Sequence, residues 1–105
     1  MFKVFRTAGF EKLINKLLTK EEQIRVNKIE DEIAELGFTG DPLRLKFLRE
    51  KRISGKRVYF LVYEDLKAVL MVSVSNKKMQ QATIDKIKEL LPEFRRLMEK
   101  MVAAI

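Results

Sequence analysis

Seven cations gather in a short basic segment, residues 44–57, which holds a single acid, Glu50. The cations are Arg44, Lys46, Arg49, Lys51, Arg52, Lys56 and Arg57. Seven cations and one acid give this segment a charge of +6, which is most of the chain's net charge of +7. Dense cations bind phosphate backbones by releasing counterions, so the segment predicts a nucleic-acid partner. The alternative is an edge strand whose cations prevent sheet aggregation. The residues expected to hold RNA are Lys46, Arg49, Lys51, Arg52 and Lys56.

An arginine and two tyrosines alternate along one predicted strand, in positions suited to RNA cleavage. Period-two alternation places Arg57, Tyr59 and Tyr63 on one face, and Lys77 and Lys78 follow the next predicted strand. Metal-free cleavage by the 2′-hydroxyl of RNA needs positive charge and proton transfer. Arginine supplies charge, and neighbouring cations are expected to lower the pKa values of tyrosine and lysine. Ordinary strand packing of the tyrosines is the alternative.

The chain has no histidine and no cysteine, which removes the usual general base, thiolate nucleophiles and the commonest zinc ligands. The acidic residues between 30 and 35 are expected on a solvated helix face rather than around a metal. Ser75 near Lys77 has the composition of a nucleophile pair, but a helix cap explains the serine better. Ser54-Gly55-Lys56-Arg57 has too few glycines for a phosphate loop. We therefore expect no metal and no small-molecule cofactor.

Length and hydropathy predict one cytoplasmic domain over residues 1–105, without a membrane partner. A chain of 105 residues is typical of a single domain, and it contains no repeat or Pro/Gly/Ser-rich linker. Its apolar runs are far shorter than the roughly 18 residues that a membrane span requires.

The first third of the chain predicts a strand followed by a helical hairpin. Residues 2–7 are rich in β formers, and apolar residues at spacings of three and four predict a helix over 8–18. Thr19-Lys20-Glu21-Glu22 has the form of a capping box, so a second helix should begin there. Gly37 is expected to end that helix.

The rest of the chain predicts three strands and a helix. Alternation from Leu43 to Leu48 indicates a strand with a basic outer face, and residues 57–63 and 68–74 predict a hairpin. A helix is expected from Asn76 onward, capped by Ser75 or Asn76, with Pro92 kinking or dividing it. The order β-α-α-β-β-β-α predicts an α+β fold, in which a small antiparallel sheet packs against the helical hairpin.

Several stretches of this order match a known family: the opening strand from Phe2 to Thr7, Phe10-Glu11-Lys12-Leu13 and the helical hairpin, Asp41-Pro42, Ser54-Gly55-Lys56-Arg57-Val58-Tyr59, and Val72-Ser73-Val74-Ser75-Asn76-Lys77-Lys78. Together they resemble the RelE/ParE toxin superfamily, and its archaeal RelE-like members in particular. The resemblance implies a RelE-like fold and the toxin of a toxin–antitoxin pair. It further implies an mRNA interferase that cleaves mRNA on the ribosome without a metal. The implied partners are mRNA, the ribosome and a RelB-like antitoxin.

The resemblance also assigns roles to individual residues. It makes Arg57 and Lys77 the groups that stabilise phosphate charge, with Lys78 as a register alternative. The family's C-terminal catalytic tyrosine falls near Thr83, so a tyrosine of the central strand would have to replace it. That departure favours a second reading, a ParE-like toxin that inhibits DNA gyrase by binding. A non-catalytic RNA-binding module is the third. The C-terminal helix is expected to cover the sheet, dock the antitoxin or pair with another copy.

Overall fold

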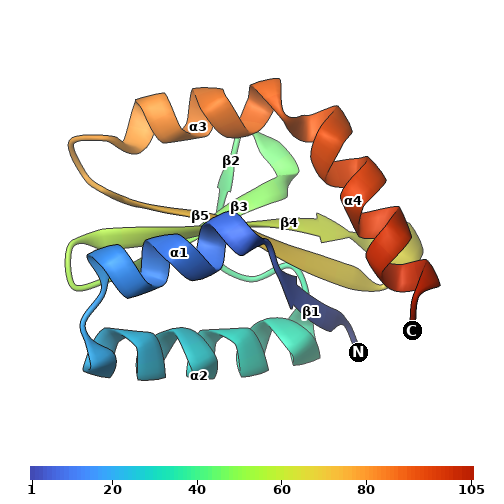
Figure 1. Ribbon diagram of the computed structural model, residues 1–105, viewed down its shortest axis with the longest axis horizontal. Coiled ribbons are helices and arrows are strands. Elements are labelled where there is room, and N and C mark those ends of the chain that lie inside the picture. The colour runs from blue at the N-terminus through green and yellow to red at the C-terminus, as the bar shows by residue number, and fades with distance from the viewer.

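The computed structural model describes all 105 residues and consists of a five-stranded sheet between two pairs of helices (Figure 1). The elements are β1 (Lys3–Arg6), α1 (Ala8–Leu17), α2 (Lys20–Leu36), β2 (Asp41–Leu43), β3 (Leu45–Ile53), β4 (Lys56–Tyr63), the 3-10 turn η1 (Glu64–Leu66), β5 (Ala68–Asn76), α3 (Gln80–Glu89) and α4 (Leu91–Ala103). The strand order is β1-β5-β4-β3-β2. Helices α1 and α2 cover one face of the sheet, and α3 and α4 cover the other. The α+β class is confirmed.

The N-terminal helical hairpin forms as predicted, because its ends carry the expected capping groups. Thr7 Oγ1 accepts a hydrogen bond from the backbone N–H of Phe10 at 2.9 Å. Thr19 and Glu22 form a complete capping box, with bonds of 2.9 and 3.1 Å. Gly37 ends α2 with a φ of 67°, in the left-handed region that favours glycine. At each helix start, a threonine hydroxyl thus satisfies one of the orphan N–H groups.

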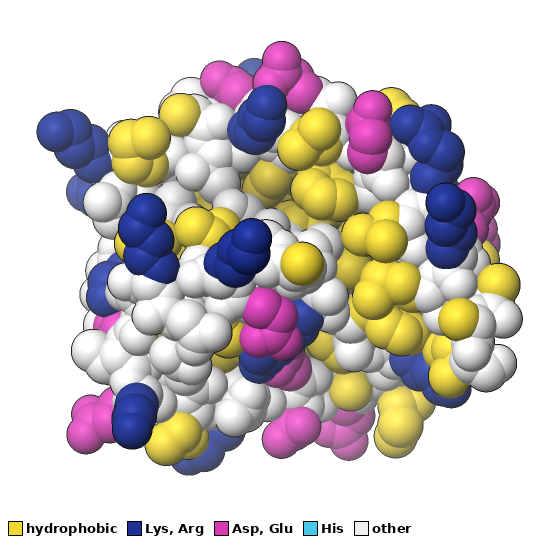
Figure 2. Space-filling view, in the orientation of Figure 1, with side chains coloured by type: hydrophobic (Ala, Val, Ile, Leu, Met, Phe, Trp, Pro, Cys, Tyr) yellow, Lys and Arg dark blue, Asp and Glu magenta, His cyan; other side chains and the backbone are white.

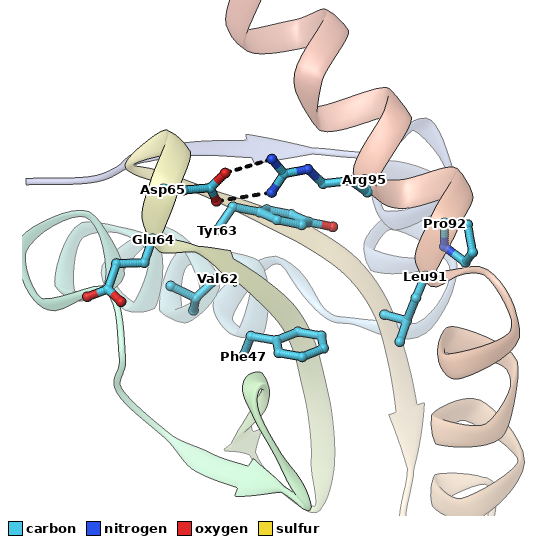
Figure 3. Close-up of a pocket in the computed structure, with 8 residues that line it drawn as sticks. All are labelled: Phe47, Val62, Tyr63, Glu64, Asp65, Leu91, Pro92 and Arg95. Carbon is cyan, nitrogen blue, oxygen red and sulfur yellow. Dashed lines mark hydrogen bonds and ion pairs between the residues drawn. The ribbon is translucent and has the colours of Figure 1, made fainter.

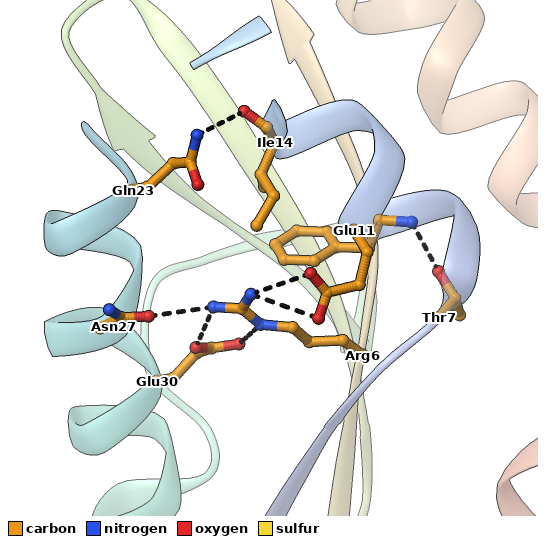
Figure 4. A network of polar contacts seen from close by, with 8 residues as sticks. Arg6, Thr7, Glu11, Ile14, Gln23, Asn27 and Glu30 are labelled. Carbon is orange, nitrogen blue, oxygen red and sulfur yellow. Dashed lines mark hydrogen bonds and ion pairs between the residues drawn. The ribbon is translucent and has the colours of Figure 1, made fainter. Parts of the chain in front are cut away.

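Arg6 fastens β1 to both helices of this hairpin (Figure 4). Its guanidinium donates two bonds of 2.7 Å to Glu30 and one of 3.0 Å to Asn27, both on α2. Longer contacts of 3.4 Å reach Glu11 on α1. The hydrogen bonds with Glu30 raise the pKa of Arg6 above its ordinary value. The charge of Arg6 is therefore used within the molecule.

The sheet differs from the prediction at both of its edges. β1 runs parallel to β5, with Val4 opposite Val69, so the predicted antiparallel sheet has one parallel pair at its edge. The single strand predicted after residue 42 is wrong, because the chain reverses at Arg44 and forms β2 and β3. Arg44 has a φ of 70°, a conformation that residues with side chains rarely adopt. Because this turn contains no glycine, the sequence pattern did not indicate a break between β2 and β3.

Strand β4 has the predicted alternation, so the two faces of the sheet bury different side chains. Val58, Phe60 and Val62 belong to the core beneath α1 and α2. Tyr59 and Leu61 belong to a second core beneath α3 and α4. β4 lies between β5 and β3, both antiparallel to it, so the predicted hairpin is confirmed.

The C-terminal helical region begins later than predicted. Strand β5 continues to Asn76, whose Oδ1 accepts a hydrogen bond from the Met79 backbone N–H at 2.9 Å, and α3 begins at Gln80. The predicted helix cap at Ser75 or Asn76 is therefore wrong. Pro92 divides the region as predicted, since it lies in the first turn of α4. None of the helices has both the length and the apolar composition needed to cross a membrane.

Candidate functional site

Arg57 lies buried on the sheet face covered by α3 and α4, next to the carboxylate of Glu50 on β3. Its Nε is 3.7 Å from Glu50 Oε2, and its Nη1 donates to the carbonyl of Gly55 at 3.4 Å. The exposed fractions of Arg57 and Glu50 are 5% and 2%. Arg57 Nε has no hydrogen-bond partner, although buried donors normally have one. The guanidinium thus keeps an unused donor inside the protein.

Helix α3 closes over this ion pair. Gln80, the first residue of α3, donates from Nε2 to Glu50 Oε1 at 2.9 Å. Further along α3, Ile84 and Ile87 pack into the core that contains Tyr59. Because Arg57 is only 5% exposed, a ligand that contacts it has to displace some of the side chains that bury it.

Tyr59 is fully buried on the same face and is hydrogen-bonded to Ser75 of β5. The two hydroxyl oxygens are 2.7 Å apart, and Ser75 Oγ donates to the Asn76 carbonyl at 3.0 Å. Because a serine hydroxyl carries one proton, Tyr59 is the donor of the shared bond. Burial raises the pKa of Tyr59. The expectation that cations lower this pKa is wrong, because desolvation outweighs the charge of Arg57.

Tyr63 lies at the opposite end of β4 from Arg57, roughly 20 Å along the strand. The guanidinium of Arg95, on α4, lies 5.5 Å from its ring centroid and makes two bonds, of 2.6 and 3.0 Å, to Asp65 (Figure 3). Burial raises the pKa of Tyr63 to about 12. These residues line an apolar cavity of about 430 Å³ between η1 and α4. Tyr63 is therefore part of the α4 contact and is not brought to Arg57.

Two lysines of the basic segment form ion pairs with α2. Lys51 Nζ is 2.6 Å from Glu32 Oε1, and Lys56 Nζ is 2.9 Å from Glu22 Oε1. The hydrogen bond from Lys51 lowers the pKa of Glu32. The pKa of Glu22 is lowered by the Thr19 backbone N–H and, to a smaller extent, by Lys56. Both lysines therefore lie on the α1–α2 side of the sheet, away from Arg57.

The other three predicted RNA-binding residues, Arg49, Lys46 and Arg52, have different surroundings. Arg49 donates hydrogen bonds of 2.7 and 3.0 Å to the carbonyls of Thr39 and Gly40 in the loop before β2, and one of 2.9 Å to the carbonyl of Lys46 in β3. Lys46 Nζ lies 4.8 Å from the ring centroid of Phe38. Arg52 has a side chain that is 67% exposed, and it is the register partner of Arg57. Arg52 is thus the exposed cation closest in register to the buried pair.

Lys77 and Lys78 are exposed in the turn between β5 and α3. They follow Asn76, the register partner of Lys56, so they lie at the end of the sheet where Arg57 lies. Thr83, where the resemblance would place a tyrosine, is half-buried on α3.

Three further residues complete the buried cluster: Glu50 and Gln80, which sequence reasoning missed, and Ser75, which it interpreted as a helix cap. Glu50 had one signal, its position as the single acid of the basic segment. Ser75 shares the face of Tyr59 because of the β4–β5 register, which contains an irregularity at Tyr59/Phe60. Gln80 had no signal, since its contact depends on where α3 begins.

The surface beside α3 is apolar rather than basic. Figure 2 shows hydrophobic side chains gathered in a hollow below α3 and beside α4, with Lys and Arg side chains spread around it. A groove of about 230 Å³ there is lined by residues of β5, α3 and α4, including Val72, Ile87 and Phe94. Asp and Glu side chains form no group of three placed to hold a metal ion.

This arrangement, a mixed sheet with a helical hairpin on one face and C-terminal helices on the other, is a RelE-like fold. The chain is similar to a variant of the Escherichia coli toxin RelE solved with a peptide of the antitoxin RelB: 13% identity, a TM-score of 0.65, and coverage of 81% of this chain and 93% of that one. The conserved hypothetical protein HP0894 of Helicobacter pylori has 16% identity and a TM-score of 0.47, over 74% of this chain and 97% of that one. No family model and no curated protein matches the sequence. The resemblance predicted from the sequence is confirmed for the fold.

Proposed function

We propose that this chain is the toxin of a toxin–antitoxin pair and that it cleaves mRNA on the ribosome. The RelE-like fold supports the class of protein, since that fold is the one of a toxin solved with its antitoxin peptide. The observation that carries the proposal is the buried arginine with a free Nε donor beside the hydrogen-bonded Tyr59 and Ser75. A phosphate is the ligand that a planar guanidinium fork binds best.

The chemistry assigned to this cluster is attack of a ribose 2′-hydroxyl on the adjacent phosphorus. A bond forms between the 2′-oxygen and phosphorus, and the bond from phosphorus to the 5′-oxygen breaks. Arg57 stabilises the charge that develops on the phosphoryl oxygens. Tyr59, whose pKa is raised, stays protonated near neutral pH and acts as the proton donor to the leaving oxygen.

Glu50 is the natural acceptor of the 2′-hydroxyl proton in this scheme. In the closed structure its carboxylate faces Arg57 and is held by Gln80. When a phosphate takes the place of Glu50 at Arg57, the carboxylate is released within reach of the ribose. Lys77 and Lys78, exposed at the same end of the sheet, are assigned to charge stabilisation only.

The scheme requires α3 to move, because Arg57 is only 5% exposed. One side-chain hydrogen bond, from Gln80 to Glu50, joins the start of α3 to the buried pair. A groove of about 230 Å³ lies beside Ile87, where residues of α3, α4 and β5 meet. In this proposal binding to the ribosome displaces α3, and a RelB-like antitoxin prevents that displacement or covers the opened face.

Mapping mRNA ends on translating ribosomes tests the proposal. We expect cuts at the ribosomal A site with the unaltered chain and at least a 100-fold loss of cutting, about 3 kcal/mol of transition-state stabilisation, in Arg57→Ala. Arg96→Ala is the matched control, since Arg96 is an exposed arginine of α4. Intact mRNA with the folded, unaltered chain would contradict the proposal.

A ParE-like toxin that binds DNA gyrase is the second candidate. Burial of Arg57 and Tyr59 favours it, because a toxin that acts by binding needs neither group at its surface. In a supercoiling assay with purified gyrase, this candidate requires inhibition together with uncut mRNA. The first candidate requires the reverse.

A further inference from the structure

Another concave surface lies between α2 and β3, on the side of the molecule where Lys51 faces α2. It is a hollow of about 250 Å³ lined by Arg25, Lys28, Ile29, Lys51 and Arg52. Arg25 and Lys28 are three positions apart on α2, so they point to the same side of that helix. Strand β2 pairs with β3 only as far as Glu50, so the edge of β3 beyond that residue is open. Four cations from two elements therefore surround one hollow, which we call the basic groove.

Most of the charge of the basic groove has no acid to balance it. Lys51 pairs with Glu32, but the side chain of Arg25 contacts only the hydroxyl of Ser54, at 2.8 Å. Lys28 has no carboxylate oxygen within 4.0 Å, and the residue is exposed. Arg52 lies 4.0 Å from Glu50, a carboxylate that already faces Arg57. Three of the four cations are thus available to an anionic ligand.

Arg52 connects the basic groove to the candidate site. Arg52 and Arg57 are direct register partners on β3 and β4. Partners in an antiparallel pair lie about 5 Å apart at their Cα atoms and share a face of the sheet. Arg57 lies on the opposite face of the sheet from Lys51, so a ligand with phosphates repeated along its length would pass from the basic groove around the open edge of β3, past the exposed Arg52, toward Arg57.

We propose that the basic groove binds the phosphodiester backbone of a single RNA strand that continues from the candidate site, an inference that rests on the proposed function. Two arginine forks fit phosphate oxygens better than they fit a flat membrane surface. Ile29 is the one apolar residue lining the groove, which gives the apolar side chains of a partner peptide little to pack against. The RNA-binding surface therefore extends beyond the basic segment to include Arg25 and Lys28 of α2.

Salt-dependent binding of a fluorescent 2′-O-methyl oligouridylate, which the proposed reaction cannot cleave, tests this proposal. Arg25→Gln with Lys28→Gln should weaken binding by roughly tenfold and reduce the slope of log affinity against log salt by about one to two units. The matched control is Lys12→Gln with Lys16→Gln, which removes two exposed lysines from α1. The control should keep the slope of the unaltered chain.

The outcomes separate this proposal from the proposed function. The proposal that the basic groove binds RNA is wrong if the two double variants have equal slopes of log affinity against log salt. It is also wrong if the chain binds polyglutamate in preference to the oligouridylate. If ribosomal cleavage depends on Arg57 while the slopes are equal, the groove fails and the proposed function stands. If the Arg25/Lys28 double variant has a reduced salt slope while the unaltered chain leaves mRNA uncut, the RNA-binding groove is supported and the proposed function fails.

Discussion

The two faces of the sheet are built differently. The α1–α2 face buries mostly apolar side chains, and its two buried polar residues, Thr7 and Glu22, cap the starts of α1 and α2. The α3–α4 face buries the polar cluster of Glu50, Arg57, Tyr59 and Ser75, and apolar hollows remain open beside its helices. A buried ion pair is weak evidence for stability, because desolvation offsets much of its attraction. We therefore expect the α1–α2 face to contribute most of the stability of the fold, and the α3–α4 face to open more readily.

The largest expected difference between the faces comes from truncating one core residue on each. Ile33→Ala on the α1–α2 side removes a fully buried isoleucine and should lower the free energy of unfolding by about 4 kcal/mol. Ile87→Ala should cost about 2 kcal/mol, because the groove beside Ile87 is already open and little new cavity forms. Urea denaturation of both variants measures the two costs, and equal costs would remove the contrast between the faces.

The buried ion pair gives the next largest effect. Arg57→Met removes the buried cation beside the Glu50 carboxylate and leaves only the exposed Arg52 near it, so we expect a loss of about 3 kcal/mol in the free energy of unfolding. Glu50→Gln in the same chain should restore most of that loss, since the neutral amide can still accept from Gln80. A double variant as unstable as the single one would mean that Arg57 contributes by packing rather than by charge.

Tyr63 gives a smaller effect that depends on pH. Its pKa is raised from 10.0 to about 12 by burial, so the folded chain holds this proton more tightly than the unfolded chain. This contribution to the free energy of unfolding, about 2–3 kcal/mol, is fully present below pH 10. It is lost as the pH rises toward about 12. Tyr63→Phe should flatten this part of a stability curve measured by urea unfolding. An unchanged curve would mean that Tyr63 is more accessible than the structure has it.

Local signals predicted the α1–α2 face well, and the other face less well. The capping box at Thr19 and the alternation of β4 each depend on residues close together in the chain. Arg44 adopts a left-handed backbone without being glycine, so the turn between β2 and β3 left no sequence pattern. The parallel pairing of β1 with β5 joins distant segments and has no local signal either.

The candidate site was predicted only in part, because some of its residues are brought together by contacts between distant segments. Alternation along β4 placed Arg57 and Tyr59 on one face. It could not show that Glu50 would lie against Arg57, or that a serine expected to cap a helix would instead bond to Tyr59. Charge along the chain predicted a cationic surface, but Glu22 and Glu32 of α2 neutralise two of its lysines.

Native-state hydrogen exchange tests most directly whether one face opens while the other holds. We expect the backbone amides of Ile84 and Ile87 on α3 to exchange through a local opening, at a free energy well below that of global unfolding. The amides of Ile14 on α1 and Ile33 on α2 should exchange only with global unfolding. Equal protection of all four amides, at the global value, would contradict the opening on which access to Arg57 depends.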